Sequence, residues 1–400
     1  MDSKTSEEKQ LISTNAGAAV VPIIPPEIIH EILDHLADDP DHGPLQSCAL
    51  ISKSWVLTCQ RRLFHTIHFT SRNMTRWLEA FPVPEESPAR HVRHLRFLIG
   101  GDDDVPKKFS EYTPRFTNAE KVSFLEGEGL MSAWRPPSWR LPQSVTSLTI
   151  DVGAVTTLIR VRDIVAQLPE LDDLSLSGSI KMVGRRAFPV IGTALMGRFG
   201  GKLRLFGRYA APSVMEMLLE APTGLHFTEV EIRGLREHLP STAKLTEACG
   251  KTLVKLSYRA TFQCRSRRFE REMSTLTPPP DVDAPVSSKR SFDFSKSPHL
   301  QEVSLGVRWT GGNLFWIPAA LSTLRSATSP RLSAIRLDFA HATNRSVRDV
   351  ISFAGSDVLQ VTDEVSRIER EFEGAVNVTV LQDAVFKGVF DTLDVRFYPC

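Results

Sequence analysis

The chain has 400 residues, with 48 Lys and Arg against 47 Asp and Glu, and a formal charge of +1. Its 42% hydrophobic and 24% charged residues are typical of a globular protein, and the length allows about two to three domains unless a repeat is present. A net charge so close to zero gives no overall field for holding nucleic acid or an anionic membrane.

The first residues carry no targeting signal that we can identify. Residues 1–21 are small and polar, and we expect them to form a disordered leader. The most apolar stretch, residues 16–24, contains Pro22 and fits neither a signal peptide nor a membrane span. The five cysteines are scattered without a Cys-x-x-Cys pair, which favours a reducing compartment. We therefore expect a cytoplasmic or nuclear protein with no membrane contact.

Residues 22–69 are predicted to form a unit of three short helices. The first helix has one apolar stripe, formed by Ile28, Ile29, Ile32, Leu33 and Leu36. Pro26 and Glu27 suit its first turn, and further helices are expected around 45–51 and 55–64. So small a unit buries little of its own surface, and its high apolar content implies that a partner covers part of it.

From about residue 90, a pair of apolar residues separated by one position recurs and predicts short strands. The pairs begin at Leu95, Val122, Leu148, Leu174, Leu203, Val230, Leu256, Val303, Ile335 and Leu393. The first seven are 26 to 29 residues apart, and nine of the ten have an apolar or small residue three positions earlier. This is the frame of a leucine-rich repeat, in which stacked units share one core. An ordinary α/β domain with chance spacing is the alternative.

Between these strands the sequence predicts returning helices and one insertion. Helical patterns occur at 155–168 and 214–219, and the widest gap predicts a helix at about 358–372 and a strand near 376–380. Residues 274–298 are rich in Pro and Ser, which is typical of an extended surface insertion. The arginines before it, between Arg259 and Arg271, form either a solvated rim or a contact for an acidic partner or RNA.

The strand residues that alternate with the core positions are the expected binding surface of such a repeat. The charged ones, which we predict to contact a bound protein, are Arg96, Arg204, Glu231, Arg336 and Asp394. The others are Ser123, Thr149, Ser175, Ser257 and Ser304. Their mixed charge indicates no particular class of ligand.

The sequence offers no catalytic, metal or cofactor site. His30 and His35 are five residues apart and would point about 140° away from each other on a helix, so they cannot share a zinc ion. Gly250-Lys251-Thr252 ends like a phosphate loop, but Leu245 takes the place of its leading glycine. We expect a protein that is not an enzyme; a hydrolase or transferase would need a converging His, Asp and nucleophile.

Residues Ile24–Ile67 resemble the F-box. The stretches that carry the resemblance are Ile24-Pro25-Pro26-Glu27-Ile28, the segment from Leu45 to Trp55, and Leu63-Phe64-His65-Thr66-Ile67. The rest resembles the divergent leucine-rich region that follows the F-box in many fungal proteins of this type. The resemblance implies docking on a Skp-family adaptor through Ile24, Pro25, Pro26, Ile28, Leu50, Ser52, Lys53 and Trp55. Within the module we expect internal core at Ile32, Leu36, Leu63 and Phe64, while Trp55 fits core or interface.

The expected fold is therefore α/β, with an N-terminal three-helix F-box at 22–69 and an irregular leucine-rich-repeat solenoid at 70–400. The resemblance implies a substrate-recognition subunit of an SCF-type cullin-RING ubiquitin ligase. In that role the adaptor links the chain to a cullin, and the leucine-rich region binds an unidentified target protein for ubiquitin-dependent degradation. A non-degradative protein-binding scaffold is the alternative, and nucleic acid is not an expected partner.

Overall fold

The computed structural model describes residues 25–38, 43–51, 53–99, 109, 111–126, 140–181, 195, 197–261, 292–309, 314–341 and 346–393. The chain divides into two compact units, Met1–Leu63 and Phe64–Cys400. The expected leader at 1–21 lies outside the described residues. Within the described ranges, no helix has the length and apolar character needed to cross a membrane.

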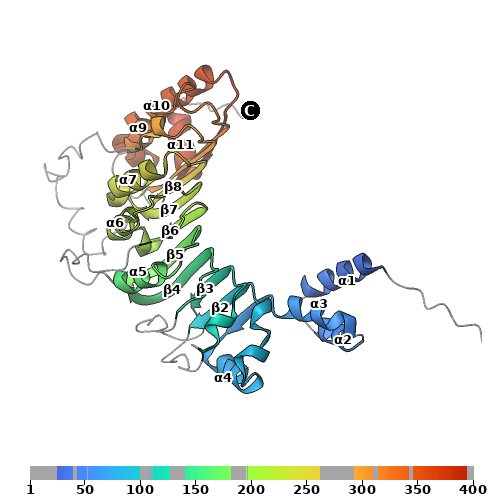
Figure 1. The fold of residues 1–400 in the computed structure, drawn as a ribbon. Coiled ribbons are helices and arrows are strands. Elements are labelled where there is room, and N and C mark those ends of the chain that lie inside the picture. Colours follow the sequence, from blue (N-terminus) through green and yellow to red (C-terminus); the bar gives the residue numbers. More distant parts are fainter. Residues whose placement is uncertain are drawn as a thin grey trace, which may run out of the picture. The chain divides into compact units, whose positions relative to one another are not determined.

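The first unit contains three helices, α1 (Pro26–Asp38), α2 (Gly43–Ile51) and α3 (Lys53–Leu63), shown in Figure 1. Leu33, Leu45 and Cys59, one from each helix, form its fully buried core. An ion pair of 2.6 Å between Arg62 and Asp34 joins α3 to α1. Three buried side chains are a small core, as expected for a unit of this length.

The second unit is built on a sheet of eleven parallel strands that follow one another in sequence order. The strands are β1 (Thr66–Phe69), β2 (His94–Ile99), β3 (Lys121–Glu126), β4 (Ser147–Thr157), β5 (Asp173–Lys181), β6 (Lys202–Phe206), β7 (Glu229–Leu235), β8 (Lys255–Thr261), β9 (Glu302–Trp309), β10 (Ala334–His341) and β11 (Asn377–Gln382). The predicted α/β class is confirmed, and a parallel sheet in this order is a solenoid-like arrangement.

Nine of the ten predicted apolar pairs lie in strands, and the strand predicted near 376–380 is β11. The tenth pair begins at Leu393, which caps helix α11, and its second residue lies outside the described ranges. Strand β1 was not predicted from the sequence. This strand lies within the range expected for the helical unit, and its Ile67 and Phe69 are in register with Leu95 and Phe97.

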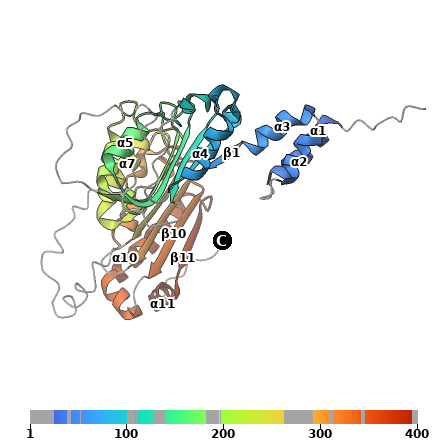
Figure 2. The same ribbon diagram turned by 90° about the horizontal axis from the view of Figure 1, so that it is seen from below.

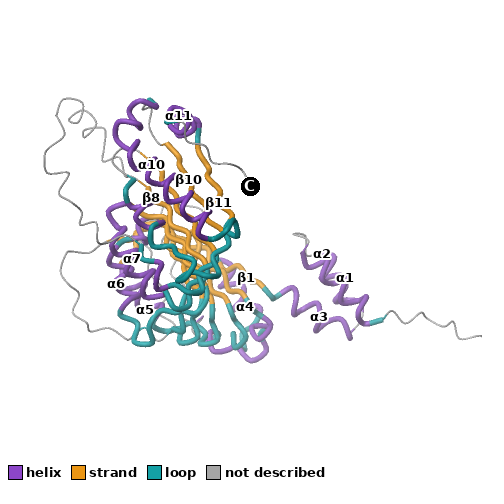
Figure 3. The backbone as a smooth tube through the Cα atoms, turned by 90° about the horizontal axis from the view of Figure 1, so that it is seen from above, coloured by secondary structure: helices purple, strands orange, loops and turns teal. Residues whose placement is uncertain are grey.

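The connections between strands contain the helices α4 (Ser71–Ala80), α5 (Leu158–Val165), α6 (Pro212–Leu219), α7 (Leu239–Cys249), α9 (Trp316–Leu321), α10 (Val347–Glu371) and α11 (Ala384–Thr392). Figure 3 shows α5, α6 and α7 on the same side of the sheet. Figure 2 shows α10 and α11 beside β10 and β11, where they close the C-terminal end. The helices predicted at 155–168, 214–219 and 358–372 are α5, α6 and α10. Because β4 continues to Thr157, α5 is shorter than predicted, and α10 begins earlier than predicted.

The core lies between the sheet and these helices. The inward residues of adjacent strands are in register, so that Leu95 aligns with Val122 and Val122 with Leu148. The repeat lacks an apolar residue three positions before Leu203, where the chain has a glycine. Phe199 is fully buried there in a left-handed backbone conformation, with φ of 48°, and packs 5.6 Å from Phe227.

The structure corrects the end of the expected surface insertion. Residues 274–291 lie outside the described ranges, but Phe292 and Phe294 are fully buried and stack at 5.7 Å. Phe292 also lies 5.2 Å from the ring of Tyr258. These aromatic residues return the chain to the core before β9, which pairs directly with β8.

Candidate functional site

The side chains that alternate with the core positions form one row across the open face of the sheet. Strand pairing places them in register in the order His68, Arg96, Ser123, Thr149, Ser175, Arg204, Glu231, Ser257, Ser304, Arg336 and Thr379. The row brings together all the predicted binding residues except Asp394, which lies outside the described residues. The row also contains His68 and Thr379, which were not predicted from the sequence as binding residues.

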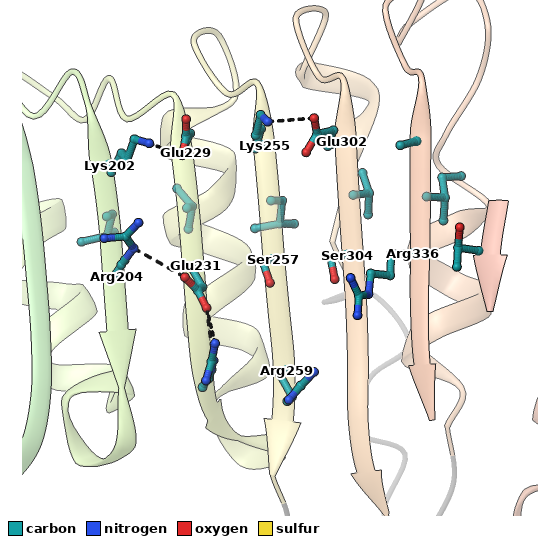
Figure 4. A pocket seen from close by; sticks show the side chains of 18 of the residues that line it. Lys202, Arg204, Glu229, Glu231, Lys255, Ser257, Arg259, Glu302, Ser304 and Arg336 are labelled. Carbon is teal, nitrogen blue, oxygen red and sulfur yellow. Dashed lines mark hydrogen bonds and ion pairs between the residues drawn. The ribbon is translucent and has the colours of Figure 1, made fainter. Parts of the chain in front are cut away.

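Over β6 to β11 this face is hollowed into a groove of about 560 Å³ (Figure 4). Six basic and three acidic side chains line the groove: Lys202, Arg204, Arg233, Lys255, Arg259 and Arg336 against Glu229, Glu231 and Glu302. The lining therefore has more basic than acidic side chains, which the net charge of the whole chain conceals. An anionic group is the ligand that such a lining attracts.

Most of these charges are paired within the groove. Lys202 lies 3.0 Å from Glu229, and Lys255 lies 2.8 Å from Glu302. The hydrogen bond from Lys255 to Glu302 raises the pKa of the lysine. Glu231 contacts two arginines, Arg204 at 3.5 Å and Arg233 at 2.7 Å. These pairs hold the side chains of β6 to β9 against the sheet.

A further ion pair crosses a strand. Arg259 on β8 pairs with Asp338 on β10, although β9 lies between them. The residue of β9 in register with both is Gly306, and a Cβ added there would lie 3.3 Å from Arg259 Cγ and 3.5 Å from Asp338 Cβ. Gly306 therefore leaves the space through which Arg259 reaches its partner. Sequence reasoning placed Arg259 in a basic cluster and missed this pair, which spans 79 residues.

The other end of the open face, over β1 to β3, is basic. His94 Nε2 lies 2.8 Å from Ser123 Oγ, and Arg96 Nη1 lies 3.5 Å from His68 Nε2. Burial, and then the charges of Arg96 and Lys121, lower the pKa of His94 to about 4. Burial and Arg96 also lower the pKa of His68. Both rings are therefore held neutral near pH 7.

The helical unit has a different kind of surface, with large apolar side chains exposed to solvent. Half of the exposed large apolar side chains in the described residues belong to this short unit: Ile28 (45% exposed), Ile32 (46%), Leu50 (89%), Ile51 (69%) and Leu57 (42%). Two of them, Ile28 and Leu50, are predicted adaptor contacts. Isolated exposed apolar residues are ordinary, whereas a concentration in one small unit indicates an interaction surface.

The remaining predicted adaptor contacts are placed as follows. Pro25 and Lys53 are exposed, and Pro26 is the first residue of α1. Ile24 and Ser52 lie outside the described residues. Trp55 is half-buried and packs against the core of the helical unit.

The expected internal core of the module is partly wrong. Ile32 is 46% exposed, because the small core accommodates only part of the apolar stripe of α1. Leu36 and Leu63 do pack against that core. Phe64 belongs to the sheet unit, where its ring lies 6.1 Å from that of Trp77.

The described residues contain no group of three His, Cys, Asp or Glu side chains that could hold a metal ion. Gly250 ends helix α7 and precedes strand β8, whereas a phosphate loop leads into a helix. Burial raises the pKa of Cys249 to about 12 and also raises that of Cys59, so neither thiol ionises readily near pH 7.

No protein-family model matches the sequence, and no curated protein shows significant similarity to it.

Proposed function

We propose that this chain is a substrate-recognition subunit of an SCF-type ubiquitin ligase. Its helical unit would dock on a Skp-family adaptor, which connects to a cullin, and the open face of its sheet would bind the target protein. Ubiquitin transfer would take place on partner enzymes. The proposal rests on the resemblance of residues 24–67 to the F-box and of the later repeat to a leucine-rich region.

The observation that carries the proposal is the exposed apolar surface of the helical unit. Leu50 is 89% exposed and Ile51 is 69% exposed at the end of α2, and Ile28 is 45% exposed on α1. Covering apolar surface stabilises a complex by roughly 25 cal/mol for each Å² removed from water. An adaptor that covers these side chains would account for their presence in a unit whose own core is small.

Affinity purification of the full chain from its native cells tests the proposal. We expect the chain to recover a Skp-family adaptor and a cullin. Leu50→Glu should lose both while retaining other partners, because a charge at a desolvated interface costs several kcal/mol, or about a hundredfold in affinity. The matched control is Leu359→Glu, which places the same charge on an exposed leucine of the sheet unit and should retain both.

Two results would argue against this function. Recovery of an adaptor without a cullin would support the non-degradative scaffold in place of the ligase subunit. Equal recovery of the adaptor by Leu50→Glu and the unsubstituted chain would show that α2 is not the docking surface.

A further inference from the structure

Arg336 occupies a singular position in the groove. In the described part of the chain it forms no ion pair, whereas each of the other five basic side chains that line the groove contacts a carboxylate. Its neighbours in the row are Ser304 on β9 and Thr379 on β11. Figure 4 shows the Arg336 side chain extending from β10 toward β9, beside Ser304.

Three hydroxyl groups lie in the same row as this arginine. Ser257 on β8 is in register with Ser304, which is in register with Arg336, and Thr379 follows on β11. Within the described residues none of the three hydroxyls has a hydrogen-bond partner, although all face the groove. They are therefore available to donate hydrogen bonds to a bound group.

The two ion pairs on either side leave this part of the groove open. Lys255 and Glu302 pair at the amino ends of β8 and β9, and Arg259 pairs with Asp338 further along the strands. Each of these acids is paired with another basic side chain, and neither forms an ion pair with Arg336. Ala334, two residues before Arg336 on β10, also lines the groove, and its small side chain leaves room above the sheet.

We propose that Arg336 and the hydroxyls of Ser304 and Ser257, toward which its side chain extends, form a seat for one oxyanion, a carboxylate or phosphate group carried by a side chain of the target protein. A guanidinium presents two parallel N–H groups that match the oxygens of either anion, and the hydroxyls add further hydrogen bonds. This proposal depends on the proposed function in one respect, because it assigns the bound anion to a target protein.

The charges of the groove favour a protein over a nucleic acid. Glu229, Glu231 and Glu302 are each paired with a basic side chain, so among the described residues that line the groove only Arg336 is left to meet the successive phosphates of a nucleic acid. A protein segment can place a single anion on Arg336 and neutral or basic residues beside those glutamates. The surrounding ion pairs thus select for an isolated negative charge.

Fluorescence anisotropy with the full chain tests the seat. The probes are three labelled pools of random peptides with phosphoserine, glutamate or glutamine fixed at the centre. We expect the phosphoserine or the glutamate pool to bind about tenfold more tightly than the glutamine pool, as for a charge-assisted hydrogen bond. The comparison of these two pools distinguishes phosphate from carboxylate. Arg336→Gln should abolish the preference, and Arg336→Lys should keep part of it.

The matched control is Arg348→Gln, which removes the same charge from an exposed arginine of helix α10 that does not line the groove. This substitution should leave the preference unchanged. An equal loss in both variants, no preference among the pools, or a ten-nucleotide single-stranded RNA bound as tightly as the best pool would overturn the proposal. Unchanged thermal unfolding of the variants would exclude misfolding. Since no adaptor is present, failure here leaves adaptor docking untouched.

Discussion

At the scale of single residues, alternation along the strands was sufficient to predict which side chains share the open face. Arg96, Arg204, Glu231 and Arg336 could be placed there because a strand turns successive residues to opposite faces. Which of them are paired could not be predicted. The bridge from Arg259 to Asp338, for example, depends on register between strands far apart in sequence and on a glycine between them.

Gly250 belongs to the Gly250-Lys251-Thr252 sequence that ends like a phosphate loop, and the structure gives this glycine a packing role. A Cβ added to Gly250 would lie 2.9 Å from the carbonyl oxygen of Lys296 and 3.1 Å from that of Glu247. Since backbone atoms cannot move aside easily, Gly250→Ala should lower the free energy of unfolding by about 1–3 kcal/mol in urea denaturation. The glycine is therefore required for close packing at the end of α7 and not for binding phosphate.

Gly355 provides the comparison, because it lies within α10 and its added Cβ would meet only Ile351 Cγ2, at 3.5 Å. Gly355→Ala should raise the free energy of unfolding by about 0.5–1 kcal/mol through helix propensity. Equal destabilisation by both substitutions would refute the packing argument for Gly250.

At the scale of elements, the recurring pair of apolar residues predicted the nine strands β2 to β10, and the gap after them predicted the position of β11. The pair recurs because two alternate residues of each of these strands face the core. Strand β1 was not predicted, since the same residues also fit the end of the F-box pattern. The length of α10 and the burial of Phe292 and Phe294 could not be predicted, because they depend on how the chain closes its C-terminal end and returns from the insertion.

The basic end of the open face predicts a pH dependence of stability. The pKa of His94 is about 4 in the folded chain, below its ordinary value of 6.5, because of burial and of the charges of Arg96, Lys121, His68 and His65. As pH falls from 6.5 toward 4, the unfolded chain takes up a proton at His94 that the folded chain does not. The free energy of unfolding should therefore decrease over this window and be fully retained above it.

His94→Gln should remove about 1 kcal/mol of that decrease, a value reduced for the solvent screening of a partly exposed ring. Urea unfolding of both chains at pH 7 and pH 4.5 measures the difference. Identical losses of stability in the two chains would show that His94 is not held neutral. His68, whose pKa is also lowered, should act in the same direction.

At the scale of the whole molecule, the chain contains a sheet unit with a groove and a helical unit with exposed apolar side chains, and the proposed function assigns target binding to the first and adaptor docking to the second. The sequence predicted both units from periodicity and resemblance. It also placed Leu50 among the adaptor contacts, but it expected Ile32 to be core. The difference arises because a helical stripe shows only which residues share a face, whereas the size of the neighbouring core decides how many of them are buried.

The most direct test of the receptor account is isothermal titration calorimetry of the purified full chain with a purified Skp-family adaptor. We expect a one-to-one complex with a Kd below about 1 μM and an affinity about a hundredfold lower for Leu50→Glu, because that substitution places a charge in the interface. Arg336→Gln, which lies in the groove of the sheet, should bind the adaptor as the unsubstituted chain does. Absence of binding by the unsubstituted chain, or equal affinity for Leu50→Glu, would contradict the account.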